Sequence, residues 1–387
     1  MYYAEHKEQS PQGNVPNLRF PEFSGEWERK KLGDIGTTLI GLTYSPQDVV
    51  TSDGIIVLRS SNIKGGLLDY TDLVRVNKKI KETIITRTND ILICARNGSA
   101  RLIGKNAILK DSDCGHTFGA FMMVYRSEDN PFVHQLLSTK RYYSQVAENL
   151  GARINQITTS DLNSFEFSFP QSNKEKVKIA GVLSLLDERI ATQIKIIEKL
   201  ESLIKGICSF LFDKSKFDSF VRLGDISKIT NGNSDVQDAS LSYGEGMYPF
   251  FDRSDDVKFL PEYILDKEAI IYPGEGSEFY PRYYNGKFAL HQRCYAIYDI
   301  LPNFTPRYLY YFCKTQNSYF VRNAVGSTVA SLRLDTFKRL NIPNTPIEVQ
   351  KVYVQLLDKV ESKIIDNKTI LKKYEEQKRY LLSNLFI

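Results

Sequence analysis

The tetrapeptide Leu-Gly-Asp-Ile occurs twice in the chain, in ERKKLGDIGTTLI at Leu32–Ile35 and in FVRLGDISKITNG at Leu223–Ile226. From Leu32 to Leu223 the spacing is 191 residues. A repeat on this scale is typical of a duplicated unit, and further matches between the two halves decide whether the duplication extends along the chain.

Three further matches support the duplication. ILICARNGSARLIGKNAIL resembles AIIYPGEGSEFYPRYYNGKFAL, which pairs Gly98 with Gly276. LGARINQITTSDLNSFEFSFP resembles AVGSTVASLRLDTFKRLNIP, which pairs Asp161 with Asp335 at a spacing of 174, and the segments that follow keep this spacing. The chain is therefore predicted to hold two copies of one unit, each a variable globular part followed by a helix of constant length.

The pattern predicts an α+β fold in which two mixed, strand-rich domains are joined by two long helices that form an antiparallel coiled coil with pseudo-twofold symmetry. Short β-prone runs such as GIIVLRS, DILICAR, AFMMVYR and EAIIYPG indicate the strands, and residues 132–150 and 306–324 each indicate a helical stretch. The predicted division is an N-terminal arm at 1–19, a first domain at 20–170, a central helix at 171–216, a second domain at 217–343 and a C-terminal helix at 344–387.

Apolar residues in the two long helices recur at alternating steps of three and four, which is the seam pattern of a coiled coil. In the first helix the seam positions are Leu183, Leu186, Ile190, Gln193, Ile197, Leu200, Ile204, Ile207 and Leu211. In the second helix they are Leu357, Val360, Ile364, Asn367, Leu371, Tyr374, Lys378, Leu381 and Leu385.

A polar amide interrupts both seams at the equivalent position, as Gln193 and Asn367. In an antiparallel pair, equivalent residues meet only near the symmetry axis, so the two amides are predicted to contact each other and to fix the register. The alternative is that both lie at a hydrated edge of the pair. Lys378 departs from the apolar pattern, and we expect it either to extend towards solvent or to mark a frayed end.

The amino-acid composition of the chain limits the classes of protein to which it can belong. The net charge of +5 and the 51 Lys and Arg residues among 387 permit nucleic-acid binding without establishing it. Five cysteines without a CxxC pair and four scattered histidines offer no zinc-ligand spacing. The first twenty residues lack the apolar core of a signal peptide, and no run of about 18 apolar residues occurs. We predict a cytoplasmic protein without a membrane segment and with a loose N-terminal arm.

Motifs for catalysis are incomplete. GSARLIGKN at 98–106 has five residues between its glycines, where a phosphate-binding loop has four, and Asn106 stands where that loop needs Ser or Thr. DNPF at 129–132 lacks the second proline of the amino-methyltransferase tetrad, and GEGSEFY at 274–280 is no nucleophile elbow. Catalysis by this chain is therefore not expected.

Residues 16–35, PNLRFPEFSGEWERKKLGDI, resemble the opening of the specificity subunits of type I restriction-modification systems. PQSNKEKVKIAGVLSLLDERI at the first long helix and PNTPIEVQKVYVQLLDKVESKI at the second resemble the same family. Together with the two variable domains, each followed by a long helix, the similarity extends over essentially the whole chain.

The resemblance implies two target recognition domains, each reading one half of a split sequence in double-stranded DNA, and spacer helices that bind two methyltransferase subunits. The partner subunits would carry S-adenosylmethionine and methylate adenine at N6, and added restriction and translocase subunits would use ATP and Mg. No cofactor is expected on this chain. A helix of about 34 residues is about 51 Å long, which would separate the two half-sites by up to roughly 15 base pairs.

DNA recognition needs Lys and Arg for phosphates, and forked or amide side chains for base edges. Three groups in the first domain supply them: Arg59, Ser61, Asn62 and Lys64; Arg96, Asn97, Ser99, Arg101 and Lys105; and Arg153, Asn155 and Gln156. Matching positions in the second domain are Arg253, Glu275, Ser277, Arg282, Tyr283, Tyr284, Lys287, Arg293, Ser327, Thr328 and Arg333. Taken singly, each of these residues fits a solvated surface charge or a turn better than a DNA contact. The prediction rests on the recurrence of three groups at equivalent places in the two copies.

Two other functions stay open. A stand-alone nucleotide-dependent enzyme would bind S-adenosylmethionine or ATP as an isolated chain. A coiled-coil scaffold would hold protein partners through its helix pair without reading DNA.

Overall fold

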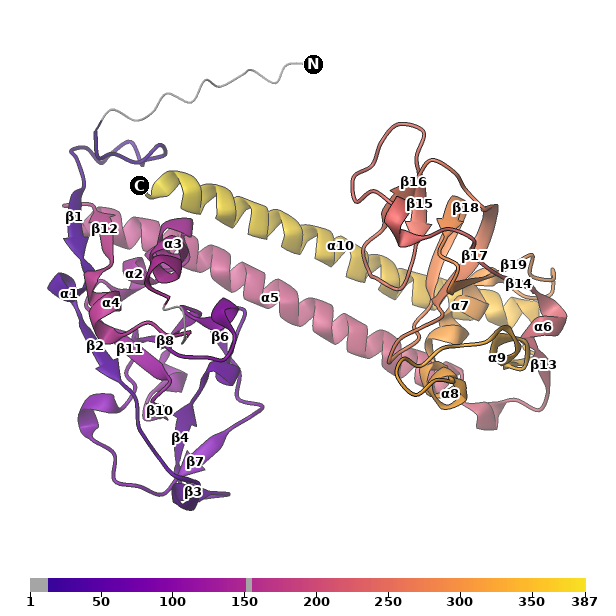
Figure 1. Ribbon diagram of the computed structural model, residues 1–387, viewed down its shortest axis with the longest axis horizontal. Helices are drawn as coiled ribbons and strands as arrows, with labels where there is room; N and C mark the ends of the chain where they lie inside the picture. Colours follow the sequence, from indigo (N-terminus) through magenta and orange to yellow (C-terminus); the bar gives the residue numbers. More distant parts are fainter. Residues whose placement is uncertain (1–12, 151–154) are drawn as a thin grey trace. The chain divides into compact units, whose positions relative to one another are not determined.

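The computed structural model of the chain describes residues 13–150 and 155–387. The chain divides into two compact units. The first unit comprises Met1–Thr192 and Leu371–Ile387, and the second unit comprises Gln193–Ile370. Each unit thus holds one of the predicted domains together with one part of each long helix (Figure 1).

The first unit contains two four-stranded sheets, ordered β2-β11-β8-β9 and β10-β4-β7-β3, and the two-stranded pairs β1-β12 and β5-β6. Its strands are β1 (Glu28–Lys31), β2 (Thr37–Ile40), β3 (Val49–Val50), β4 (Ile55–Leu58), β5 (Ile63–Lys64), β6 (Leu67–Leu68), β7 (Val74–Val76), β8 (Ile91–Cys94), β9 (Asn106–Ile108), β10 (Thr117–Phe118), β11 (Met122–Arg126) and β12 (Glu166–Phe169). Its short helices are α1 (Leu32–Ile35), α2 (Asn130–Leu136), α3 (Lys140–Asn149) and α4 (Thr159–Ser164).

The second unit gathers six strands into one sheet, ordered β14-β19-β17-β18-β15-β16, and adds the pair β13-β20. Its strands are β13 (Phe220–Arg222), β14 (Lys228–Asn231), β15 (Tyr248–Phe251), β16 (Lys258–Leu260), β17 (Leu265–Pro273), β18 (Arg282–Leu290), β19 (Cys294–Tyr298) and β20 (Asn341–Pro343). Its short helices are α6 (Leu223–Ile226), α7 (Pro306–Lys314), α8 (Asn317–Asn323) and α9 (Leu334–Lys338).

The two domains share the order of their main strands, and they differ where β9 and β10 of the first unit correspond to β18 of the second. In the first unit, β9 pairs with β8 and the separate strand β10 pairs in parallel with β4. In the second unit the one long strand β18 makes both kinds of pairing, antiparallel with β17 and parallel with β15. The extra residues between β9 and β10 therefore split one sheet into two in the longer, first domain.

The repeated tetrapeptide forms the short helices α1 and α6. Its leucine, Leu32 or Leu223, is fully buried in each copy. Its glycine allows close packing, since a Cβ atom on Gly33 would lie 3.1 Å from the backbone oxygen of Asn163 in α4, and one on Gly224 would lie 3.0 Å from the side chain of Lys338 in α9. The tetrapeptide thus recurs because each domain packs this turn against the same partner helix.

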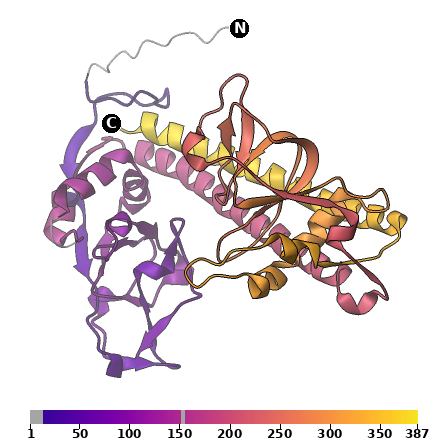
Figure 2. The same ribbon diagram turned by 45° about the vertical axis from the view of Figure 1, so that its right-hand side comes forward.

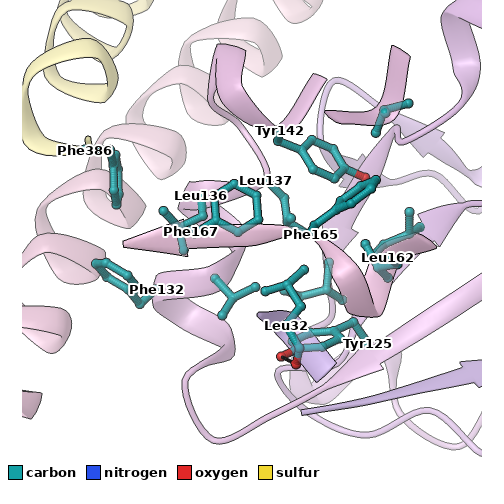
Figure 3. Close-up of a cluster of buried hydrophobic side chains, with 14 of the residues drawn as sticks. Leu32, Tyr125, Phe132, Leu136, Leu137, Tyr142, Leu162, Phe165, Phe167 and Phe386 are labelled. Carbon is teal, nitrogen blue, oxygen red and sulfur yellow. Dashed lines mark hydrogen bonds between the residues drawn. The ribbon is translucent and has the colours of Figure 1, made fainter. Parts of the chain in front are cut away.

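The core of the first unit joins the domain to the end of α10. Figure 3 shows Phe132 and Leu136 of α2 beside Phe167 of β12, with Phe386 reaching towards them from the chain's last turn. The rings of Phe132 and Phe386 have centroids 5.4 Å apart. The predicted helix over 132–150 is broken in two after Leu136, because Thr139 caps the N-terminus of α3 by accepting from the backbone nitrogen of Tyr142.

Both long helices have 39 residues, α5 from Asn173 to Leu211 and α10 from Ile347 to Leu385, and they lie side by side in both views (Figures 1 and 2). In the first unit, Ile179 and Leu183 from the start of α5 share a core with Leu385 from the end of α10. In the second unit, Ile204 from the end of α5 shares a core with Leu357 from the start of α10. The helices are therefore antiparallel, and the predicted fold class is confirmed.

The seam residues divide by burial. The buried ones are Leu183, Leu186, Gln193, Ile197, Ile204, Leu357, Val360, Ile364 and Leu385. The half-buried ones are Ile190, Leu200, Ile207, Leu211, Asn367, Leu371, Tyr374, Lys378 and Leu381. Near the end of α5, Cys208 and Phe212 are buried beside the predicted positions and join the core of the second unit.

Charged side chains anchor each domain to the helix pair. In the first unit, Asp187 of α5 binds Lys378 of α10 at 2.5 Å and accepts from Gln135 of α2 at 3.2 Å. In the second unit, Glu361, which occupies the repeat position of Asp187, binds Arg307 at 2.6 Å and Lys314 at 3.1 Å. Lys378 is therefore an ion-pair partner in the seam, and neither expected role, extension into solvent or a frayed end, describes it.

The described end of the N-terminal arm is fixed to the first unit. The backbone nitrogen of Leu18 donates to the carbonyl oxygen of Asn384 at 2.8 Å, at the end of α10. Arg19 forms two hydrogen bonds of 2.8 Å with the buried carboxylate of Glu175 near the start of α5. The expectation of a loose arm is wrong for these residues, because the end of α10 and the start of α5, which lie at the same end of the antiparallel pair, both bind them.

Candidate nucleic-acid interface

A cleft of about 1150 Å³ opens in the first domain, and side chains from all three predicted groups line it. The lining comes from the segment after β2, from β3 and β7, from the ends of β4 and β8, from the turn between β10 and β11, and from the segment before α4. Among the predicted residues it includes Arg59, Ser61, Arg96, Asn97 and Asn155. Residues that are far apart in the sequence are thus brought to one concave surface.

Hydrogen bonds tie these groups together. Asn97 donates from Nδ2 to the hydroxyl of Ser60 at 3.1 Å, and its Oδ1 accepts from the backbone nitrogen of Ser99 at 3.0 Å. Asn155 donates from Nδ2 to the carbonyl oxygen of Gly98 at 3.0 Å. The loop after β8 is therefore hydrogen-bonded both to the end of β4 and to the segment before α4. These bonds fix the conformation of the loop at the edge of the cleft.

Phe121 also lines this cleft and is not among the residues predicted from the sequence. It lies in the turn before β11, its side chain is 58% exposed, and the Arg96 guanidinium carbon stands 5.1 Å from its ring centroid. The ring and the guanidinium attract each other through a cation–π contact, and both side chains stay exposed at the cleft. In the sequence Phe121 is only one more apolar residue of the run AFMMVYR, so nothing there separates it from the strand.

Several predicted residues of the first domain have other surroundings. Asn62 is fully buried and was wrongly assigned to DNA: its amide donates to the carbonyl oxygens of Asp69 and Asp72, which fixes the local loop. Arg59 and Lys64 are engaged in ion pairs, with Asp72 at 2.8 Å and Asp69 at 2.7 Å. Outside the cleft lining lie Lys64, Ser99, Arg101, Lys105 and Gln156. Arg153 lies outside the described residues.

The second domain has a cleft of about 580 Å³, at the ends of β15, β17 and β18. Of the predicted residues, Arg253, Glu275 and Arg293 line it, together with the unpredicted Asp235, Asp252 and Lys258. Burial opposes ionisation of Asp252, but hydrogen bonds from Lys258 and Ser254 hold the pKa of its carboxyl below the usual value. This cleft is therefore more acidic than the first.

Glu275 and Arg293 form an ion pair in the second cleft. The side chain of Glu275 is 16% exposed and that of Arg293 is 62% exposed. Ser331 donates a further hydrogen bond to the same carboxylate oxygen, Oε1, at 3.2 Å. Glu275 is thus fixed on the floor of the cleft, and the guanidinium of Arg293 projects beyond it into solvent.

The remaining predicted residues of the second domain lie outside this lining. Tyr283 was wrongly expected at the interface: its hydroxyl binds Glu268, and its ring lies 5.7 Å from that of Tyr310 at the helix-facing side. Tyr284 packs on Phe251 at 5.2 Å in the sheet core. Arg282 donates to the carbonyl oxygen of Ser254. Lys287, Ser277, Ser327, Thr328 and Arg333 are exposed and do not line the cleft.

The long helices carry exposed apolar side chains that the seam does not use. Val182 on α5 and Leu356 on α10 occupy equivalent repeat positions, and both are exposed. Ile196 and Ile370 form a second equivalent and exposed pair. A partner protein that covers one member of such a pair would find the same chemistry at the other.

Neither a metal site nor a membrane span is found where the structure describes the chain. Within residues 13–150 and 155–387, three or more His, Cys, Asp or Glu side chains nowhere gather closely enough to hold a metal ion. The described helices also include none that is long and apolar enough to cross a bilayer.

Two strand-rich domains that each carry a cleft, and that alternate with two antiparallel helices, define a protein of duplicated architecture. The chain belongs to the family described as the type I restriction modification DNA specificity domain, whose model matches residues 24–202 and 215–376 and so covers both copies of the repeat.

Known relatives agree with this membership. The chain is 26% identical, over 188 residues, to the specificity subunit of the type I restriction enzyme EcoKI from Escherichia coli strain K12, and equally to that of the enzyme StySPI from Salmonella potsdam. In both cases the match covers 46% of this chain and 40% of the relative. Among solved structures, the S subunit of a type I restriction-modification system from M. genitalium has a similar fold, with a TM-score of 0.69 at 17% identity over 96% of this chain and 99% of that one.

Proposed function

We propose that this chain is the DNA specificity subunit of a type I restriction-modification complex. It reads a bipartite, asymmetric target and docks adenine-N6 methyltransferase subunits, and through them restriction subunits. The observation that carries the proposal is the convergence of three predicted groups on one cleft in the first domain, with Arg253, Glu275 and Arg293 lining a cleft in its duplicate, within a chain of this family.

The types of side chain that line the two clefts favour DNA as their ligand. Their linings combine arginines, which suit phosphates and guanine, with amides and a carboxylate, which suit other base edges. Because the two linings differ in charge, the two half-sites are expected to differ in sequence. One domain per half-site makes the target bipartite.

The exposed residues of the helix pair are consistent with the binding of two copies of one partner. Equivalent exposed apolar residues on α5 and α10, such as Val182 and Leu356, offer the same contact twice. Two methyltransferase subunits would therefore bind in equivalent ways. In this proposal S-adenosylmethionine, ATP and Mg are bound by the partner subunits, and the complex acts in the cytoplasm.

The experiment is reconstitution of the full chain with its methyltransferase subunits, followed by binding to duplexes of defined sequence. The complex should discriminate its target from unrelated duplexes by a factor of about 10³ or more, and its affinity should fall steeply as salt rises. Equal affinity for all duplexes would refute the proposal and favour a scaffold. Calorimetric binding of S-adenosylmethionine or ATP to the isolated chain would instead favour an enzyme.

A further inference from the structure

Backbone pairing identifies equivalent positions in the two clefts independently of sequence similarity. After β8, Arg96 forms an antiparallel bridge with Gln156. After β17, Glu275 forms an antiparallel bridge with Ser331. Arg96 and Glu275 are therefore the same position in the two domains, and the charge there is reversed.

A second pair of equivalent positions faces the first. The turns before β11 and β19 each start at a parallel bridge, Gly119 with Leu42 and His291 with Ser234. Phe121 follows two residues into the first turn, and Arg293 follows two residues into the second. An exposed phenylalanine in one domain thus stands where an exposed arginine stands in the other.

In each domain the residues at the two positions contact each other. Arg96 stacks over Phe121, with 5.1 Å from the guanidinium carbon to the ring centroid. Glu275 is ion-paired with Arg293. Both pairs line their clefts, and the arginine of each pair is exposed. The arginine therefore occupies the position after β8 in the first domain, and the position before β19 in the second domain.

The chemistry of each pair matches a different combination of bases. An arginine fork fits the O6 and N7 atoms of guanine, a phenyl ring contacts the 5-methyl group of thymine, and a carboxylate accepts from the N4 amino group of cytosine. Within the described chain, the hydrogen bonds that Glu275 accepts both end on Oε1, so Oε2 is available for a base. The ion pair also orients Arg293, which keeps other N–H groups for guanine.

We propose that these two pairs read the bases of two unlike half-sites. In the first half-site, Arg96 contacts a guanine and Phe121 contacts the methyl group of an adjacent thymine. In the second, Arg293 contacts a guanine and Glu275 accepts a hydrogen bond from the amino group of a cytosine. This inference rests on the proposed function, since it takes DNA to be the ligand of both clefts.

The test maps methylated adenines in cells that produce the full chain together with its methyltransferase subunits. The wild-type motif should contain guanine next to thymine in one half and a G·C-rich step in the other. Phe121→Ala should relax the thymine position alone, and Glu275→Gln should shift the cytosine position towards adenine, because an amide pairs with N6 and N7 of adenine. Each variant should leave the other half of the motif unchanged.

Modified duplexes isolate single atoms with the purified complex. Replacing the thymine by uracil removes only the methyl group, and it should weaken wild-type binding roughly tenfold while leaving the Phe121→Ala complex unaffected. Replacing the guanine by 7-deazaguanine should weaken binding through loss of the arginine contact. Ile40→Ala and Glu262→Gln, at exposed positions outside both clefts, serve as matched controls and should keep the wild-type motif.

The outcomes separate this inference from the proposed function. A wild-type complex that methylates no defined motif would refute the proposed function itself. A clear bipartite motif that Phe121→Ala and Glu275→Gln leave unchanged, or that lacks thymine in one half, would overturn only the assignment of these pairs. Circular dichroism and binding of the methyltransferase subunits establish that each variant is folded before its motif is compared.

Discussion

Gln193 donates from its side-chain amide to the backbone carbonyl oxygen of Asn367 at 3.2 Å, and also to the side-chain oxygen of the same residue. Asn367 in turn donates to the carbonyl oxygen of Lys363 at 2.6 Å. A buried amide costs stability unless it is paired, and a pair that fits only one alignment of two helices favours that alignment. We therefore propose that the contact fixes the register of the two helices in the part of the helix pair that belongs to the second unit.

Replacing both amides by leucine should keep or raise stability, because two apolar side chains fill the seam without unpaired polar atoms. The single variant Gln193→Leu should be less stable than the double variant by about 1 kcal/mol, since Asn367 then loses its partner. Urea unfolding measures both. Loss of folded protein in the double variant would contradict the seam position of these residues, and faster hydrogen exchange around Gln193 would report the loosened register.

The buried His134 should make the free energy of unfolding depend on pH. Burial, helped by the charge of Lys378 and opposed by Asp187, lowers the pKa of this histidine from 6.5 to about 4. The unfolded chain binds a proton below pH 6.5 whereas the folded chain stays neutral, so stability is fully present above pH 6.5 and is lost as the pH falls towards 4. The loss should approach about 1 kcal/mol per pH unit in this window.

The measurement is urea unfolding between pH 7 and pH 4.5 for the wild type and for His134→Gln. The variant cannot take up this proton, so its stability should fall less steeply across the same range. His116, whose pKa is also lowered by burial, remains in both proteins and acts as an internal background. Parallel curves for the two proteins would show that His134 does not carry the effect.

Arg307 holds the second domain to α10, and its removal should be costly. Its guanidinium binds Asp358 and Glu361 and lies 4.9 Å from the ring centroid of Tyr311. Arg307→Met leaves the partly buried Asp358 without its cation and Glu361 with Lys314 alone, and it should destabilise the protein by about 2 kcal/mol or more. Arg339→Met, which removes the exposed i,i+4 pair with Asp335, is the matched control and should cost less than about 1 kcal/mol. Equal effects in urea unfolding would argue against an anchoring role.

The exposed apolar residues of the helix pair predict the stoichiometry of docking. Val182→Glu and Leu356→Glu should each lower the number of bound methyltransferase subunits from two to one, because a charge in an apolar contact resists desolvation. The double variant should bind none. Light scattering of the purified mixtures gives the mass, and Lys199→Glu at an exposed position is the charge control. Two bound subunits in the double variant would place docking elsewhere.

Much of the architecture could be predicted because duplication and helical periodicity are properties of the sequence itself. The repeated tetrapeptide marks a turn whose buried leucine and closely packed glycine, such as Leu32 and Gly33, tolerate few substitutions. The seam is visible because its period survives over 39 residues in each helix. The division of one sheet into two in the first domain was not predictable. It depends on whether this segment forms two strands, as in β9 and β10, or one continuous strand, as in β18.

The interface was harder to predict, because side-chain type does not determine which way a residue points. Asn62 and Tyr283 have the right chemistry for DNA, yet the fold uses the first within a loop and the second beside α7. Phe121 has the wrong chemistry for a simple charge-based search and still lines the cleft. The equivalence of Arg96 with Glu275 is visible only in backbone pairing, because the insertions between the strands shift the sequence spacing.

We propose that this chain gives a methyltransferase complex its target sequence. The most direct test is genome-wide mapping of N6-methyladenine in cells that carry the partner subunits, with and without this chain. We predict one split, asymmetric motif, with two unlike halves and an unread spacer, that disappears when the chain is removed. Methylation that is unchanged by removing the chain, or confined to one uninterrupted motif, would contradict the account.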